Sequence, residues 1–237
     1  MLEKLTPKEE VALAKQMIAQ VAAHDYAALE PQLDVSLQSP DLHDKLEEVA
    51  KLIPAGEPKN IKTVGAVTTS MRSVTRYDLT FEYQYEHDWL IVNTLLERRD
   101  GKIKLAGMHF MPRKQSLAAE NAFTLAGKSI WHYVVLALAV AIPLFMIYAL
   151  VMCIRTKIPK RKWLWLIFIA VGLMRFQLNW TTGAWGIQPL AFQVLGSGFY
   201  KTGAVAPYIF SLSFPLGAVV FLLKRKSFKR QAAVSQD

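Results

Sequence analysis

A run of 25 residues without a charged side chain, Ile130–Ile154, most strongly limits what this chain can fold into. A helix rises 1.5 Å per residue, so this run would be about 37 Å long, more than the roughly 30 Å of a bilayer core. Trp131 and Tyr133 lie at its start, where aromatic side chains anchor membrane helices. Pro143 lies within it and frees a backbone carbonyl that a neighbouring group must satisfy. The run predicts a membrane-spanning helix.

The charge distribution separates the chain into two halves. The 237 residues carry a net charge of +9, yet Asp237 is the only acidic residue after Lys128. Ten of the 12 basic residues in that half fall in two clusters, at 155–162 and 224–230. Basic clusters beside apolar segments indicate the cytoplasmic side of a membrane. The positive charge therefore predicts a topology, and we expect no nucleic-acid partner.

Two more apolar segments predict a membrane domain of three transmembrane helices, which we place at 129–226. Besides the first span at 130–154, the second is expected at 163–180 and the third at 203–223. The segment 181–200 between them is uncharged and rich in glycine, and we interpret it as re-entrant or interfacial. A full fourth crossing is the alternative.

This topology predicts a multi-pass protein of the cell (inner) membrane. Three spans place both basic clusters and the tail at 227–237 in the cytoplasm, and residues 1–128 outside it. The start of the sequence has no apolar stretch. The orientation therefore requires an export segment upstream of Met1, or else the first half is cytoplasmic and the positive-inside rule fails.

Residues 1–112 predict a soluble α+β domain, followed by a linker at 113–128. Up to Ile53, apolar side chains recur at spacings of three and four, as in amphipathic helices. From Asn60 the period is two, most clearly over Arg76–Glu86, which indicates strands. We expect two or three helices packed on a curved four-stranded antiparallel sheet.

The order of these elements resembles the nuclear transport factor 2-like superfamily over about residues 8–112. The resemblance rests on HDYAALEPQLD before the sheet and RDGKIKLAGMHFMP at its end, and it is strongest to small bacterial members without an assigned activity. It implies a cone-shaped domain with a pocket between sheet and helices. In some members the pocket is an active site with an Asp–His pair or a lone Asp, whereas many members only bind small molecules or oligomerise. No catalytic motif of the family can be placed on this sequence.

Two groups of residues are candidates for a site. The ligand-pocket candidates are Tyr77, Leu79, Phe81, Tyr83 and His109. The first four alternate along one strand, a pattern more typical of a core face, although tyrosines also suit an amphipathic pocket. The intramembrane polar candidates are Arg175, Gln177 and Asn179 in the expected second span. A charge there is costly, so Arg175 is either an anchor that reaches the interface or part of a polar site between helices.

The expected function is a membrane-tethered module that binds a ligand or another protein. No metal, cofactor or catalytic residue is expected, because metal, phosphate-loop and dinucleotide signatures are missing from the sequence. The expected partners are the lipid bilayer, a small apolar ligand, another membrane protein or a second copy of the chain. One alternative is an enzyme acting on a small apolar or lipid substrate through Asp78, His109 or Arg175. Another is a transport-related subunit that uses Thr181–Tyr200.

Overall fold

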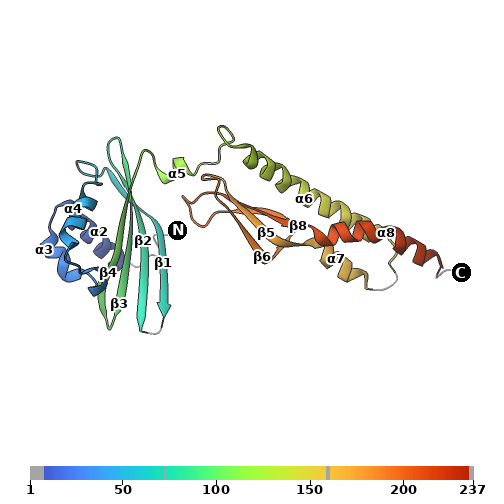
Figure 1. Ribbon diagram of the computed structural model, residues 1–237, viewed down its shortest axis with the longest axis horizontal. Coiled ribbons are helices and arrows are strands. Elements are labelled where there is room, and N and C mark those ends of the chain that lie inside the picture. Colours follow the sequence, from blue (N-terminus) through green and yellow to red (C-terminus); the bar gives the residue numbers. More distant parts are fainter. Residues whose placement is uncertain (1–7, 72, 159–160, 235–237) are drawn as a thin grey trace. The chain divides into compact units, whose positions relative to one another are not determined.

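A computed structural model describes residues 8–71, 73–158 and 161–234 of the chain. The chain divides into two compact units, Met1–Glu120 with Gly203–Val205, and Asn121–Thr202 with Ala206–Asp237 (Figure 1). Each unit contains one four-stranded antiparallel sheet, which we call sheet A in the first unit and sheet B in the second.

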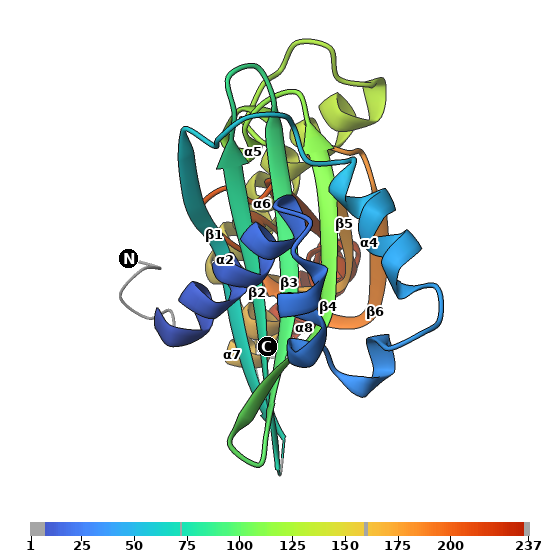
Figure 2. The same cartoon turned by 90° about the vertical axis from the view of Figure 1, so that its left-hand side faces the viewer.

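The first unit places its helices before its sheet. The helical elements are α2 (Lys8–Ala22), α3 (Tyr26–Leu29), η1 (Glu30–Gln32), η2 (Val35–Leu37), α4 (Leu42–Ala50) and, after the sheet, α5 (Leu117–Glu120). The strands of sheet A are β1 (Asn60–Met71), β2 (Val74–Gln84), β3 (Trp89–Arg99) and β4 (Lys102–Arg113), paired in this order. Figure 2 shows α2 crossing one face of this sheet.

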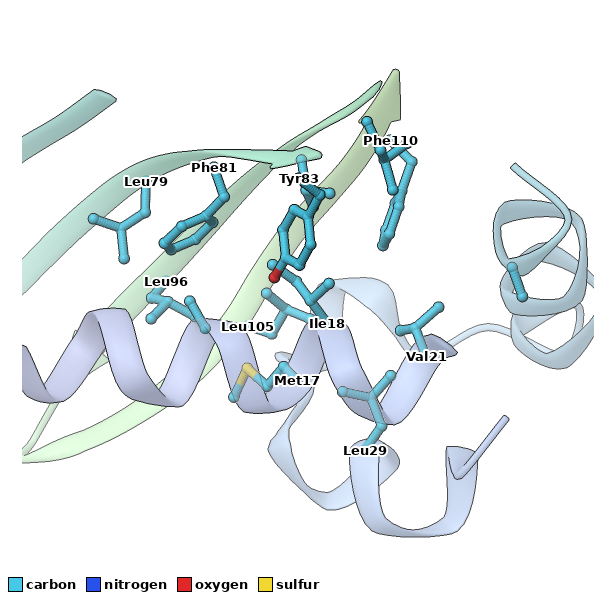
Figure 3. Close-up of a cluster of buried hydrophobic side chains, with 14 of the residues drawn as sticks. Met17, Ile18, Val21, Leu29, Leu79, Phe81, Tyr83, Leu96, Leu105 and Phe110 are labelled. Carbon is cyan, nitrogen blue, oxygen red and sulfur yellow. The ribbon is translucent and has the colours of Figure 1, made fainter. Parts of the chain in front are cut away.

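The core of the first unit lies between α2 and sheet A. Ile18 projects from α2 toward Tyr83 of β2 (Figure 3), and both are buried in one cluster with Met17, Leu79 and Phe81. Burying one apolar face of the helix and one face of the sheet against each other is the main stabilising term in a layered domain.

The second unit is built on one long helix. Its helices are α6 (Ile130–Arg155), α7 (Lys162–Ala170) and α8 (Leu216–Val234). Its strands are β5 (Val171–Asn179), β6 (Trp185–Val194), β7 (Ser197–Tyr200) and β8 (Ile209–Phe214), in the spatial order β6-β5-β8-β7. The α7 and α8 helices approach so closely that a Cβ on Gly217 would overlap the carbonyl oxygen of Phe168.

The predicted fold class is wrong for the second half. In the part of the chain that the structure describes, α6 alone is long and apolar enough to cross a membrane, and that by length and composition only. The predicted span at 163–180 contains most of α7 and β5, and the one at 203–223 contains β8 and only the start of α8, so a three-helix, multi-pass domain is not supported. The predicted re-entrant segment 181–200 instead contains a turn, β6 and β7.

Apolar and polar residues alternate with a period of two in part of each segment that was expected to be a membrane helix, and this is why each segment contains a strand. In β5, Phe176 and Leu178 alternate with polar side chains, and Phe210 and Leu212 do the same in β8. Phe176 pairs with Leu212, and Leu178 with Phe210, so the four share one face. That face packs on α6 through Val135. Alternation is the property of a half-buried strand and does not give a helix with one apolar stripe.

Pro143 interrupts the hydrogen bonding of α6, and sheet B repairs it. Proline has no N–H, so the carbonyl of Ala139, four residues earlier, loses its partner in the helix. The hydroxyl of Ser197 in β7 donates to that carbonyl oxygen at 2.6 Å. The bond satisfies a partly buried backbone group and also fixes β7 against the helix.

We predict that Ser197→Ala lowers the thermal unfolding midpoint of the second unit, because it orphans the Ala139 carbonyl at a cost of about 1–3 kcal/mol. The same substitution in a Pro143→Ala chain should have a much smaller effect, because the restored N–H then takes over the carbonyl. Ser227→Ala is the matched control, since Ser227 donates to an exposed helical carbonyl. An equal loss in both backgrounds, measured by circular dichroism, would contradict this account.

Candidate functional site

A cavity of about 400 Å³ lies in the first unit, between β4 and the helical segments beside it. Most of its wall is apolar and includes Leu33, Leu37, Leu46, Val49, Met108 and Phe110. A concave, mostly apolar site of this volume is typical of small-molecule binding. We therefore take this cavity as the candidate functional site.

An irregularity in β4 aims the side chains of this wall. Leu105 and Met108 both line the cavity, although residues three apart in a regular strand point to opposite faces. Leu96 pairs with Leu105 and Leu95 with Gly107, so Ala106 is an extra residue in β4. This β-bulge brings the two halves of the strand into one wall.

The connection from η1 to η2 closes one side of the cavity. Leu33 forms a parallel bridge with Leu105, and the backbone N–H of Asp34 donates to the Leu105 carbonyl at 2.8 Å. The carboxylate of Asp34 then accepts from the backbone N–H of Ser36 at 3.0 Å and holds the start of η2. The wall is therefore fixed to the sheet by backbone bonds.

Polar side chains reach the cavity from η2, from its connection to α4 and from α4 itself, through Ser36, Ser39, Lys45 and Glu48. The Nζ of Lys45 lies 2.8 Å from the Oδ2 of Asp41, one turn earlier on the surface of α4. A hydrogen bond from Lys45, the largest effect, and another from Ser39 lower the pKa of the Asp41 carboxyl to about 2. Among the described residues of the wall, Lys45 and Glu48 are the only ones with a titratable side chain, and both are exposed. The wall therefore offers shape and apolar contact, with no buried acid or base.

The predicted ligand residues of β2 lie in the core and not in the cavity wall. Leu79, Phe81 and Tyr83 are buried in the cluster beside α2 (Figure 3), and Tyr77 belongs to the same cluster. Burial also raises the pKa of the Tyr83 hydroxyl well above its usual value. These side chains support the fold behind the cavity.

The predicted candidate on β4, His109, is exposed, and it pairs with Asn93 of β3. Its neighbours Met108 and Phe110 line the cavity instead. His109 is not among the described residues that line the cavity. The missing signal is the bulge at Ala106, which no simple alternation reveals.

Two buried acids of the first unit, Glu10 and Glu97, are paired with arginines, whereas the buried Glu82 accepts from the backbone N–H of Leu117. Glu10 on α2 is 4% exposed and accepts a hydrogen bond from Arg98 on β3. The Arg98 guanidinium also lies over the ring of Tyr77, whose pKa is raised by burial and by a hydrogen bond to Glu10. The arrangement ties the start of α2 to the sheet. Sequence reasoning missed it because Glu10 occupies the buried stripe of an otherwise apolar helix face.

The structure brings two of the three polar candidates of the second half together on sheet B. Arg175 pairs with Ser213 and Gln177 with Ser211, so all four share the face turned away from the apolar pairs. The Arg175 guanidinium donates to the carbonyl of Phe192 at 3.2 Å. The face is polar, but β5 is a strand, so the expected position of Arg175 along a membrane helix is wrong.

Asn179, the third polar candidate, organises the turn after β5. Its side-chain oxygen accepts from the backbone N–H groups of Thr181 and Thr182 at 2.9 and 3.1 Å. Gly183 completes the turn with a positive φ of 73°. This is the geometry of an Asx turn, which asparagine favours for structural reasons.

Among the described residues, no group of three or more His, Cys, Asp or Glu side chains could hold a metal ion. Comparison of the chain with protein-family models, with curated proteins and with solved structures gave no match.

Proposed function

We propose that this protein is a membrane-anchored binding module, in which α6 enters a bilayer and the cavity of the first unit takes a small apolar molecule. The observation that carries the proposal is the wall of that cavity, which is apolar inside and polar only through Ser36, Ser39, Lys45 and Glu48. We also propose that the first unit is a member of the nuclear transport factor 2-like superfamily. Its helices, its four antiparallel strands and a cavity between them support that membership.

The surface of α6 supports the membrane anchor. The helix has 26 residues, and only 17% of its most apolar window is buried, unlike the core helix of a soluble domain. Val140, Leu144 and Ile154 are among its exposed side chains. At 1.5 Å per residue the helix is about 39 Å long, which exceeds a hydrocarbon core of roughly 30 Å. Lipid would cover these side chains, each worth about 1.5–3 kcal/mol when buried.

The charges beside α6 support an orientation. Arg155, Lys157 and Lys162 lie at or just after its end, whereas Lys128 is the nearest basic residue before its start. Basic residues concentrate on the cytoplasmic side of membrane helices. We therefore propose that the end of α6 faces the cytoplasm and that the first unit lies outside it, at the cell (inner) membrane.

We predict that 1-decanol binds in the cavity and shifts the methyl signal of Met108 in a ¹³C-methionine-labelled chain. Val49→Trp should weaken this binding roughly tenfold, because displacing two methylenes from the wall removes about 0.8 kcal/mol each. Asp44→Trp is the matched control, since Asp44 lies on the exposed side of the same helix. The exposed Met71 should not respond. The same affinity in both tryptophan variants would argue against the site.

A lysine in the middle of α6 should weaken membrane association. Leu144 is 61% exposed, and Leu144→Lys places a charge near the centre of the helix at a cost of about 2.5–3.5 kcal/mol. The membrane fraction that resists carbonate extraction should fall. Val35→Lys, which replaces an apolar residue 79% exposed in the first unit, should leave that fraction unchanged. If Leu144→Lys extracts like the unaltered chain, α6 is not the anchor.

The orientation predicts which positions are reached from outside the cell. Cys153 is the chain's single cysteine, so Cys153→Ala provides a background for Val35→Cys and Lys157→Cys. A membrane-impermeant maleimide should label the first position on intact cells, and the second only after the membrane is opened. The reverse pattern would place the first unit in the cytoplasm.

A further inference from the structure

A second cavity, of about 420 Å³, lies in the second unit between the start of α6 and the β5–β6 hairpin. Its wall includes Trp131, His132 and Val135 of α6, Phe176 of β5, Gly183 of the turn and Trp185 of β6. The ring centroids of Phe176 and Trp185 stack at 6.1 Å with an angle of 22° between their planes. None of the described lining residues carries a charged side chain, so the cavity suits an uncharged, ring-bearing molecule.

His132 supplies a hydrogen-bonding group that none of the described residues uses. The residue is 7% exposed, and its Nδ1 lies 2.8 Å from the hydroxyl oxygen of Ser129. Its Nε2 is buried and has no hydrogen-bond partner. Such an orphan costs about 1–3 kcal/mol, so a bound polar atom would recover stability there.

The edge of the ring that carries Nε2 lies beside Gly183, another residue of the cavity wall. A Cβ on Gly183 would lie 3.3 Å from the Cε1 of His132 and 3.8 Å from its Nε2, so this edge faces a residue without a side chain. The ring also packs edge to face on Trp180, with centroids 5.2 Å apart. Trp180 is itself fixed, because its Nε1 donates to the Thr124 carbonyl at 2.8 Å.

The tautomer decides which oxygen suits Nε2. When the Ser129 hydroxyl donates to Nδ1, Nε2 carries the hydrogen and donates. When Nδ1 carries the hydrogen, Nε2 accepts. A hydroxyl group satisfies both cases, because it donates and accepts, whereas a carbonyl satisfies only the first.

We propose that this cavity binds an uncharged aromatic alcohol, with its ring against Phe176 and Trp185 and its hydroxyl on the Nε2 of His132. The ring supplies the apolar contact that the wall favours, and the hydroxyl supplies the missing partner of the histidine. The site belongs to the second unit alone, so it does not depend on the cavity proposed in the first.

The test uses 2-naphthol as probe and naphthalene as its analogue without the hydroxyl, on the full chain in lipid nanodiscs. The ratio of the 2-naphthol affinity to the naphthalene affinity is measured in the unaltered protein and in His132→Phe. Dividing the first ratio by the second cancels the different partition of the two probes into lipid. We expect a quotient of about 3–10, the range of one neutral hydrogen bond. His109→Phe changes an exposed histidine of the first unit and should leave the ratio as in the unaltered protein.

A measurement on the unaltered protein covers the case in which His132→Phe does not fold. The imidazole ¹⁵N signal of Nε2 of His132 should move on titration with 2-naphthol and stay in place with naphthalene. A quotient of one, or an unmoved Nε2 signal at saturating 2-naphthol, would overturn the proposal and leave His132 as a buried structural residue.

Discussion

The second unit depends on α6, a helix whose apolar surface meets several different partners. Its first half contacts sheet B through Val135, and its second half packs on α7 and α8 through Met146, Ala149 and Cys153. These residues recur at spacings of three and four, so one stripe along the helix meets the sheet in its first half and the two helices in its second. The break at Pro143 falls between these halves, where Ser197 of sheet B satisfies the freed carbonyl of Ala139. Sheet and helix therefore stabilise each other.

In the first unit, local patterns carried enough information to predict the elements. The stripe of α2 and the alternation of β2 are both amphipathic, because one face of each meets the other and the opposite face meets water. What they could not predict is the cavity. Its wall depends on the extra residue Ala106 in β4 and on the bridge from Leu33 to Leu105. Both are tertiary features with no sequence period.

In the second unit, the high overall hydrophobicity of the segments 163–180 and 203–223 concealed the period of two that indicates strands. A membrane helix and a strand buried on both faces are both rich in apolar residues, so length decides between them. The polar candidates Arg175, Gln177 and Asn179 are spaced by two, as are Ser211 and Ser213. That spacing places Arg175 and Gln177 on one strand face opposite the two serines, whereas a helix would have spread them around its surface.

The same unit shows why its histidine was overlooked. Ser129 and His132 are three residues apart at a helix start, a spacing at which the side chain of the first residue meets that of the fourth. A glutamate at the fourth position would accept a hydrogen bond from the backbone at the helix start. It would leave no second ring edge to be satisfied. A histidine has a second nitrogen on the far edge of its ring, and this edge is left facing Gly183. A side-chain contact at the helix start thus leaves a polar nitrogen in an apolar wall.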